Sequence, residues 1–438
     1  MKTGNPVTGL PGWILHRVVA NYWFLALCAV ISAPIALAAV LHLDRNGLTA
    51  WLLDRDLAPV ETADAAKEVV GIIAGIDAAY ITLYFSISLI VLTIAAGNLG
   101  VRLIDRWLGK RLVRVSIGGL SFTLIFTVLT LASVDSEAAL ADTPLTAVAA
   151  CIGFLLINTA MLAVALHDLG RTMFVDSAID ELARDAARPR FKLEGAAPFT
   201  GKLAYRVAAP RDGYVEGMEL DKLERRLAAH PGAIRICVAP GQHVLNGETL
   251  IALEHELATS DDILGDIPIG SFRSNSQGAV FQIRLLVEIA ARALSPAVND
   301  FYTALAVADA LTEVIVGHRE TWVDDGAMPV IGQSGTLELP GQDFRGLFQG
   351  PLAAFRQAAA DYPSVAIHMI RNYRRICDIP FANAVQVHRK GLINFLYDEA
   401  KSLSEHAAAR AQHDADREHI LTAFDEFRQM RTAGRTPS

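Results

Sequence analysis

The sequence predicts an α-helical membrane protein with four transmembrane helices, followed by a cytoplasmic α+β region. Composition is the first observation behind this prediction, because the 438 residues are 52% hydrophobic and only 20% charged. The second is position: nearly all the excess hydrophobicity precedes residue 170, in four long apolar runs. A chain of this length is also too long for one typical core, so two or more domains are expected.

Each apolar run is long enough to cross a bilayer. An α-helix needs about 20 residues to span a hydrocarbon core of about 30 Å, and the runs occupy residues 21–43, 69–97, 115–134 and 145–166. The first run is longer than the apolar region of a signal peptide, which favours a first span. We therefore predict a membrane domain over residues 21–166, preceded by a cytoplasmic N-terminus at 1–20.

Loop charges predict the orientation, since basic residues near span ends are retained in the cytoplasm. The loop 98–114 has a single acid, Asp105, against five bases: Arg102, Arg106, Lys110, Arg111 and Arg114. The loop 135–144 has acids and no base, and acids outnumber bases in 44–68. Both termini are therefore expected in the cytoplasm.

Charge and cysteine content exclude several kinds of partner. The net charge of −8 leaves no basic footprint, so nucleic acid is not expected as a partner. Cys28, Cys151, Cys237 and Cys377 are scattered without metal-ligand or redox spacing. We expect no metal and no cofactor, and the lipid bilayer and further copies of the chain as partners.

Three further regions follow the membrane domain. Residues 167–191 read as a helical stalk that continues the fourth span, and 200–260 as a small β-domain with glycine turns. Within it, "APGQHVLNGETLIAL" (239–253) resembles half of a biotinyl-lipoyl-type barrel sandwich, without the Met-Lys-Met hairpin that carries a cofactor. Residues 261–430 read as a helical domain, and 431–438 as a disordered tail.

The stretch "RALSPAVND" (292–300) joins two amphipathic helices in the helical domain. Arg284, Glu288 and Arg292 lie four residues apart, which is typical of a salt-bridge ladder. The helix should end near Ser295, because residues before proline avoid the α region. Asn299 and Asp300 compete as N-caps of the next helix. The stretch is thus at least a helix-loop-helix corner.

The residues around this corner resemble a known family. "IGSFRSNSQGAVFQIRLLVEIAARALSPAVNDFYTAL" (269–305), after four spans and a β-segment, is similar to the bacterial predicted membrane proteins called domain of unknown function 2254. The family pattern departs here at Ser274, Gly278 and Phe301. The resemblance implies the bacterial inner membrane as the location, and no activity. The matching polar corner comprises Arg273, Gln277, Arg292, Ser295, Pro296, Asn299, Asp300 and Thr303.

Polar residues inside the spans suggest a second candidate site. Asn158 lies near the middle of the fourth span, where an unpaired amide is costly. Asp77 lies about two turns into the second span, a depth that allows snorkelling, and Thr82 and Ser86 follow it along that span. These four residues either form a polar path through the membrane or pair between helices.

The sequence leaves the function open between two classes. The preferred hypothesis is a homo-oligomeric channel-like or sensor protein whose cytoplasmic domain assembles or regulates the spans. The alternative is a non-conducting membrane scaffold that recruits a cytoplasmic partner, with exposed apolar patches on the helices after residue 344. No catalytic motif is found, and an enzyme would need Arg273, Gln277, Arg292 and Asp300 to converge. We expect Arg292 and Asp300 in a buried network that fixes two helices, with replacement of Asp300 damaging assembly.

Overall fold

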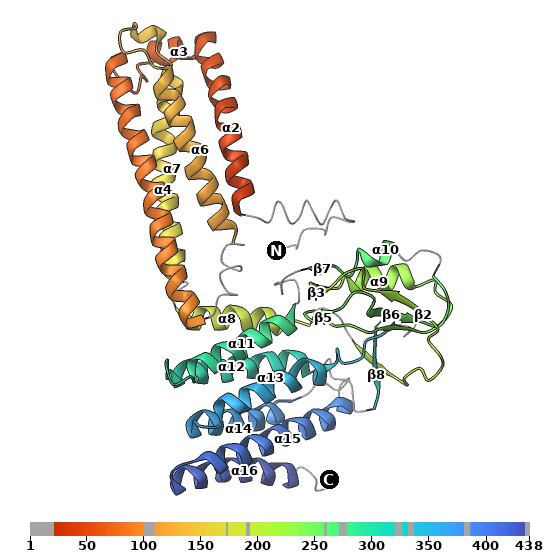
Figure 1. Ribbon diagram of the computed structural model, residues 1–438. Coiled ribbons are helices and arrows are strands. Elements are labelled where there is room, and N and C mark those ends of the chain that lie inside the picture. The colour runs from red at the N-terminus through yellow and green to blue at the C-terminus, as the bar shows by residue number, and fades with distance from the viewer. Residues whose placement is uncertain are drawn as a thin grey trace. The chain divides into compact units, whose positions relative to one another are not determined.

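The chain forms two compact units, Met1–Phe174 and Val175–Ser438. The computed structural model describes residues 22–99, 110–171, 174–189, 193–257, 261–270, 278–319, 326–331, 337–380 and 386–433. The predicted N-terminal segment 1–20, most of the basic loop and most of the tail lie outside these residues. Figure 1 draws both units.

The first unit confirms the four predicted apolar helices. They are α2 (Tyr22–Leu43), α4 (Ala63–Leu99), α6 (Arg111–Ser133) and α7 (Leu145–Arg171). All four have the length and composition to cross a membrane. Three of them exceed their predicted bounds. Helix α4 starts six residues before position 69, α6 starts four residues before position 115, and α7 continues five residues past position 166.

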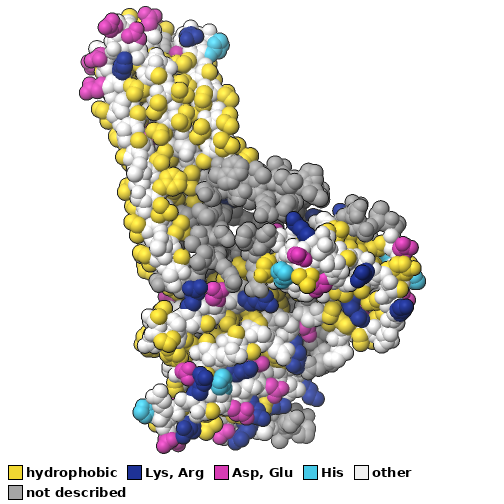
Figure 2. All heavy atoms as spheres, viewed as in Figure 1, with side chains coloured by type: hydrophobic (Ala, Val, Ile, Leu, Met, Phe, Trp, Pro, Cys, Tyr) yellow, Lys and Arg dark blue, Asp and Glu magenta, His cyan; other side chains and the backbone are white. Residues whose placement is uncertain are grey.

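Helix α6 packs against each of the other three long helices. Aromatic rings form part of the contact with α7, where the Phe126 and Phe154 centroids are 5.2 Å apart. The outer surface carries many exposed apolar side chains, among them Ile35, Leu89 and Leu156, and Figure 2 shows them covering the sides of the unit. A surface of this kind suits lipid as its solvent.

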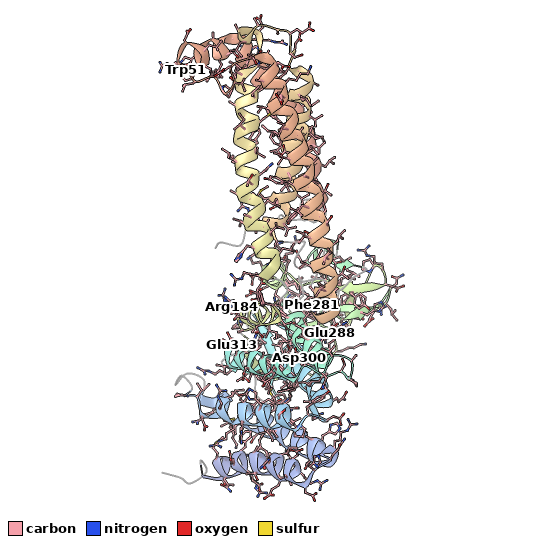
Figure 3. All side chains as sticks on the ribbon, turned by 90° about the vertical axis from the view of Figure 1, so that its left-hand side faces the viewer. Trp51, Arg184, Phe281, Glu288, Asp300 and Glu313 are labelled. Atoms are coloured by element: carbon pink, nitrogen blue, oxygen red, sulfur yellow. The ribbon has the colours of Figure 1, made fainter. Side chains whose placement is uncertain are left out.

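Short helices close one end of this unit. These are η1 (Asp44–Leu48), α3 (Thr49–Asp54) and η2 (Leu140–Asp142). Asp44 accepts hydrogen bonds from the Thr49 hydroxyl at 2.9 Å and the Thr146 backbone N–H at 3.1 Å, so it joins α3 to the start of α7. Trp51 is partly exposed at this end (Figure 3), and the Arg55 guanidinium lies over its ring. Acidic side chains gather there in Figure 2.

The expected stalk over 167–191 is divided between two helices. Helix α7 ends at Arg171, and α8 (Val175–Ala186) begins the second unit. Ile179, Leu182, Ala183 and Ala186 are buried on one face of α8, against α11 and α12. An apolar stripe with this spacing is typical of a helix that packs on a core, whereas a stalk surrounded by solvent would have no apolar face to bury. Helix α8 is therefore part of the second unit's core packing.

The β-region of the second unit contains two sheets. Their strands are β1 (Glu194–Ala196), β2 (Tyr205–Ala208), β3 (Gly213–Val215), β4 (Ile234–Ile236), β5 (His243–Val244), β6 (Thr249–Leu253), β7 (Ile269–Gly270), β8 (Met328–Ile331) and β9 (Leu337–Glu338). The strand order is β1-β8-β9-β4-β6-β2 in one sheet and β5-β3-β7 in the other. Only the β4–β9 pairing is parallel among the described strands.

Four strands, β1, β7, β8 and β9, lie outside the expected 200–260 range of the β-domain. Strands β8 and β9 come from the predicted helical domain and pair antiparallel. Glu338 anchors them, because its carboxylate lies 2.7 Å from Arg235 Nε on β4 and accepts from the Phe199 N–H at 2.6 Å. Gly241 and Gly247, at the expected turns, adopt the left-handed φ values of 84° and 83° that favour glycine. The short helices α9 (Leu220–Leu227) and α10 (Asp261–Leu264) complete this region.

The remaining helices stack in successive pairs. They are α11 (Ala279–Ala293), α12 (Phe301–His318), α13 (Phe344–Ala359), α14 (Pro363–Asp378), α15 (Gln386–Arg410) and α16 (Asp414–Ala433). Helix α11 packs on α13, α12 on α14, and α14 on both α15 and α16. The pairs therefore form layers (Figure 1). The last two helices, α15 and α16, are separated at residues 411–413, within the predicted helical domain.

Candidate functional site

The motif corner is a tight turn held by its own backbone. Helix α11 ends at Ala293, and the Ser295 hydroxyl donates to the Arg292 carbonyl at 2.7 Å. The N–H groups of Val298 and Asn299 donate to the Ser295 carbonyl. Pro296 cannot continue a helix, so the turn follows from local chemistry. Asn299 adopts a left-handed φ of 51°, which asparagine tolerates better than most residues.

Asp300 is the N-cap of α12. Its Oδ1 accepts from the Thr303 N–H at 3.1 Å, and its Oδ2 accepts from the Thr303 hydroxyl at 2.6 Å. The Asp300 N–H donates to the Ala293 carbonyl at 2.7 Å. Of the two competing caps, the structure therefore selects Asp300, and its polar atoms are used inside the chain.

Arg292 does not join Asp300 in a buried network, so that expectation is wrong. The Arg292 side chain is 40% exposed and pairs with Glu288 one turn earlier on α11, at 3.3 Å. Figure 3 places Glu288 on α11 and Asp300 at the start of α12. Arg273 and Gln277 lie outside the described residues. Arg292 and Asp300 therefore do not converge on a common site, since Arg292 pairs with Glu288 and Asp300 with Thr303.

Tyr362 is the residue at this corner that sequence reasoning missed. It precedes α14, and its phenol donates to the Leu294 carbonyl at 2.8 Å, 3.3 Å from Asn299 Oδ1. The corner before α14 therefore lies directly against the corner before α12. The Tyr-Pro pair at 362–363 was the available signal for a helix start, but nothing in the sequence linked it to residues 294 and 299.

A second polar site lies inside the four-helix unit. Asp77 on α4 is fully buried, and its carboxylate accepts from the Thr127 hydroxyl at 3.1 Å and from Asn158 Nδ2 at 3.3 Å. The same amide nitrogen lies 2.6 Å from the Thr123 hydroxyl oxygen. We call Asp77, Thr123, Thr127 and Asn158 the Asp77 cluster. It joins α4, α6 and α7.

The depth of the Asp77 cluster corrects the expected shallow position of Asp77. Asn158 lies thirteen residues from each end of α7, Leu145–Arg171. Thr123 and Thr127 belong to the middle of α6, Arg111–Ser133. Since α4 starts earlier than predicted, Asp77 lies level with the centres of both neighbours. Neither helix end is close enough for the carboxyl to snorkel.

Thr82 and Ser86 do not belong to this cluster. Both are exposed on the outer surface of α4, where the Thr82 hydroxyl donates to the Ala78 carbonyl at 2.9 Å. The expected path through Asp77, Thr82, Ser86 and Asn158 is therefore divided between two faces within one chain. Thr123 and Thr127 were missed, although threonines at positions 123, 127 and 130 share a face of the third span.

A second set of buried polar side chains lies between Asp77 and the C-terminal end of α4. Tyr84 and Ser116 are 1% exposed and Ser88 is 5% exposed. The Tyr84 phenol faces both serines, and neither serine oxygen reaches a hydrogen bond of ordinary geometry. Beyond them, Lys110 pairs with Asp168 at 3.3 Å. Among the described residues, no three His, Cys, Asp or Glu side chains gather in a way that would hold a metal ion.

Comparisons with known proteins agree with the architecture. A sequence model of the family described as "Predicted membrane protein (DUF2254)" matches residues 20–375. "Uncharacterized protein Rv1290c" of Mycobacterium tuberculosis and "Uncharacterized protein Mb1321c" of Mycobacterium bovis are each 26% identical over 270 residues, covering 56% of this chain and 51% of theirs. The chain thus spans about half the length of these relatives. No solved structure matches it.

Proposed function

Because the chain belongs to the DUF2254 family of predicted membrane proteins, we propose that it is a proton-responsive membrane protein of the channel or sensor type. The group proposed to gain and lose the proton is the Asp77 carboxyl. The carrying observation is a fully buried carboxyl group at mid-depth in a four-helix membrane unit. An ionisable residue inside a membrane is expensive to keep, which favours a functional reason for it.

The partners of Asp77 explain why its protonation state matters. Thr127 and Asn158 are neutral donors, and hydrogen bonds from neutral groups offset only part of the cost of burying a full charge. Protonation removes that charge but adds a donor among groups that already donate. Gain or loss of the proton therefore changes how α4 is held against α6 and α7.

A proton suits the Asp77 cluster better than a metal ion does. The cluster atoms contact one another directly, at separations of 2.6 to 3.3 Å. A metal cation would have to part these hydrogen bonds and recruit more oxygen ligands. A proton binds to a carboxylate oxygen without displacing a neighbour.

The test is infrared spectroscopy of the full-length protein in nanodiscs during a pH titration. We expect a protonated-carboxyl band that titrates and is lost in Asp77→Asn. The matched control is Asp168→Asn, because Asp168 is a partly exposed carboxylate paired with Lys110. A spectrum in which Asp77→Asn removes no titrating band would exclude the proposal.

Proton flux then separates the channel version from the sensor version. In proteoliposomes with a pH-sensitive dye inside, a channel gives flux that falls in Asp77→Asn. A sensor gives the titrating band without flux. Further copies of the chain belong to the channel version, in which the outward hydroxyls of Thr82 and Ser86 would meet between subunits. Light scattering that finds a monomer contradicts that version.

The proposal also places the second unit in the cytoplasm of a bacterial cell, with the spans in the inner membrane. Its support is the basic loop before α6 and the acidic loops elsewhere. Cys237 is exposed in the β-region and gives a test. A membrane-impermeant maleimide should label Cys237 in lysed cells and spare it in intact spheroplasts. The comparison of residues 239–253 with half of a barrel sandwich is likewise a proposal, supported by the two glycine turns.

A scaffold remains the alternative, and one observation favours it. The corner before α12 presents exposed apolar side chains, Pro296, Ala297, Val298, Phe301 and Tyr302, which we call the corner patch. The scaffold hypothesis expected such surfaces after residue 344, where Leu421 is the exposed large apolar residue among those described. A scaffold requires no response of Asp77 to pH, so the infrared titration distinguishes the two functions.

A further inference from the structure

The corner patch is unusually exposed for its composition. Tyr302 is 72% exposed, Val298 46% and Phe301 39%. The rings of Phe301 and Tyr302 lie with centroids 4.3 Å apart, so they present one continuous aromatic surface. A contiguous apolar patch on a soluble surface marks an interaction site more often than scattered apolar residues do.

The backbone beneath the patch is fixed, although its side chains are uncovered. Asp300 caps α12 from within the turn, and Tyr362 bonds the Leu294 carbonyl from the next helix pair. Such a turn fixes the backbone of Phe301 and Tyr302 at the start of α12 while much of their side-chain surface stays exposed. These hydrogen bonds therefore hold the turn in one conformation and keep the corner patch on the surface.

Helix α8 shows toward which end of the second unit the patch lies. The C-terminal ends of α8 and α12 meet, because His318 Nε2 lies 2.7 Å from the Ala186 carbonyl oxygen. The buried face of α8 then runs back along α12 from Ala186 to Ile179. Both helices thus start at the same end of the unit, and the patch is at the start of α12.

The length of chain before α8 limits how far this end can be from the bilayer. Helix α7 ends at Arg171 and α8 starts at Val175, and four residues span at most about 14 Å. At about 1.5 Å per residue, α12 extends about 10 Å beyond the start of α8. The patch is therefore carried on the end of the unit that is tethered to the membrane.

We propose that the corner patch rests in the headgroup region of the bilayer. Tyrosine suits that region because its ring can be buried while its hydroxyl remains hydrated, and the phenylalanine ring adds apolar area beside it. Two rings, a valine and a proline on a fixed turn form a shallow anchor that adds to the spans. This inference does not depend on Asp77.

The test is photo-crosslinking of the full-length protein in native membranes. p-Benzoylphenylalanine is placed at Tyr302, and the matched control places it at Leu421, which is 43% exposed on α16. We expect a mass shift of one phospholipid at position 302 and none at 421. Position 301 serves as the second variant if the first does not fold.

Three other outcomes would overturn the inference. A product of twice the chain mass at position 302 would assign the patch to a second copy. A product with a different protein would assign it to a cytosolic partner and favour the scaffold. Equal lipid labelling at 302 and 421, or none at 302 and 301, would show that the patch is not held at the bilayer.

Discussion

The Nδ2 atom of Asn158 lies 3.3 Å from Oδ1 of Asp77, at the centre of the four-helix unit. It also lies 2.6 Å from the Thr123 hydroxyl oxygen, so one amide group on α7 bridges α4 and α6. Water is scarce at that depth, so a polar side chain that loses its hydrogen-bond partner there finds no water molecule to replace it. The first prediction follows from this arrangement.

Replacing Asn158 with leucine should destabilise the four-helix unit and shift the Asp77 carboxyl band. The expected cost is about 1–3 kcal/mol, because a buried carboxyl loses one of its donors. Ser32→Leu is the control, since Ser32 is exposed on α2, where its hydroxyl donates to the Ala29 carbonyl, and this change should alter neither quantity. Unfolding in mixed micelles gives the free energy. Equal behaviour of the two variants would contradict the bridging role of Asn158.

Asp300→Ala should lower the stability of the second unit without changing the mass of the assembly. Asp300 caps α12 through Thr303, and loss of an N-cap costs about 1 kcal/mol. This replaces the expectation that Asp300 supports assembly through a buried network. Asp300→Ser should restore most of the loss, because serine also caps. Light scattering alongside thermal unfolding measures both, and a smaller assembly would reinstate the original view.

Tyr362→Phe tests whether the two corners are joined. The variant keeps the ring and removes the hydroxyl that donates to the buried Leu294 carbonyl. We expect a loss of about 1 kcal/mol, the usual net value of one hydrogen bond. Tyr205→Phe is the control, as Tyr205 is 42% exposed on β2. Stability unchanged in Tyr362→Phe would mean that the corners are held by packing alone.

Helical periodicity made most of the fold predictable from the sequence. The four spans appear close to their expected bounds, and α11 and α12 flank the corner as expected, because long apolar runs and amphipathic stripes are local signals. Strands β8 and β9 were not placed, since their pairing with β4 and β1 depends on contacts more than a hundred residues away. The break between α15 and α16 was missed because the segment is polar and carries no proline or glycine there.

The candidate sites were predictable in part for the same reason. The turn at Pro296 and the cap at Asp300 are local, and the sequence contained both. Predicting the pairing of Asp77 with Asn158 would have required knowing how deep each residue lies along its helix. Helix α4 starts six residues earlier than predicted, so Asp77 lies deeper than the sequence suggested. Thr82 and Ser86 were predicted to form a polar path or interhelical pairs together with Asp77 and Asn158, but both lie on the exposed face of α4. Sequence periodicity shows which residues share one face of a helix, but it does not show whether that face contacts another helix or lies on the outer surface.

Acidification should loosen α8 from α12 through His318. Burial between these helices lowers the pKa of His318 from its ordinary 6.5, outweighing the hydrogen bond to the Ala186 carbonyl. The folded state then favours the neutral ring, so its contribution to stability is present above pH 6.5 and is lost as the pH falls through the folded-state pKa. The melting temperature should decline less steeply with falling pH in His318→Gln, and His413→Gln, on the surface between α15 and α16, should follow the wild type. Parallel slopes for all three proteins would contradict this role.

The same contact gives the last prediction, because Gly317 lies where α12 comes closest to the end of α8. A Cβ atom at Gly317 would overlap the Ala187 carbonyl oxygen, and a backbone atom cannot rotate away as a side chain can. Gly317→Ala should therefore cost about 1–3 kcal/mol, the range for an overpacked core, although alanine is the better helix former. Gly350→Ala on α13 is the matched control, since no atom lies within 4 Å of its Cβ position. Thermal unfolding of the two full-length variants should place Gly317→Ala well below the wild type and Gly350→Ala at or above it, because alanine favours the helix. If both variants matched the wild type, α8 would not be packed on α12 as described, and the argument that places the corner patch at the tethered end of the unit would fail with it.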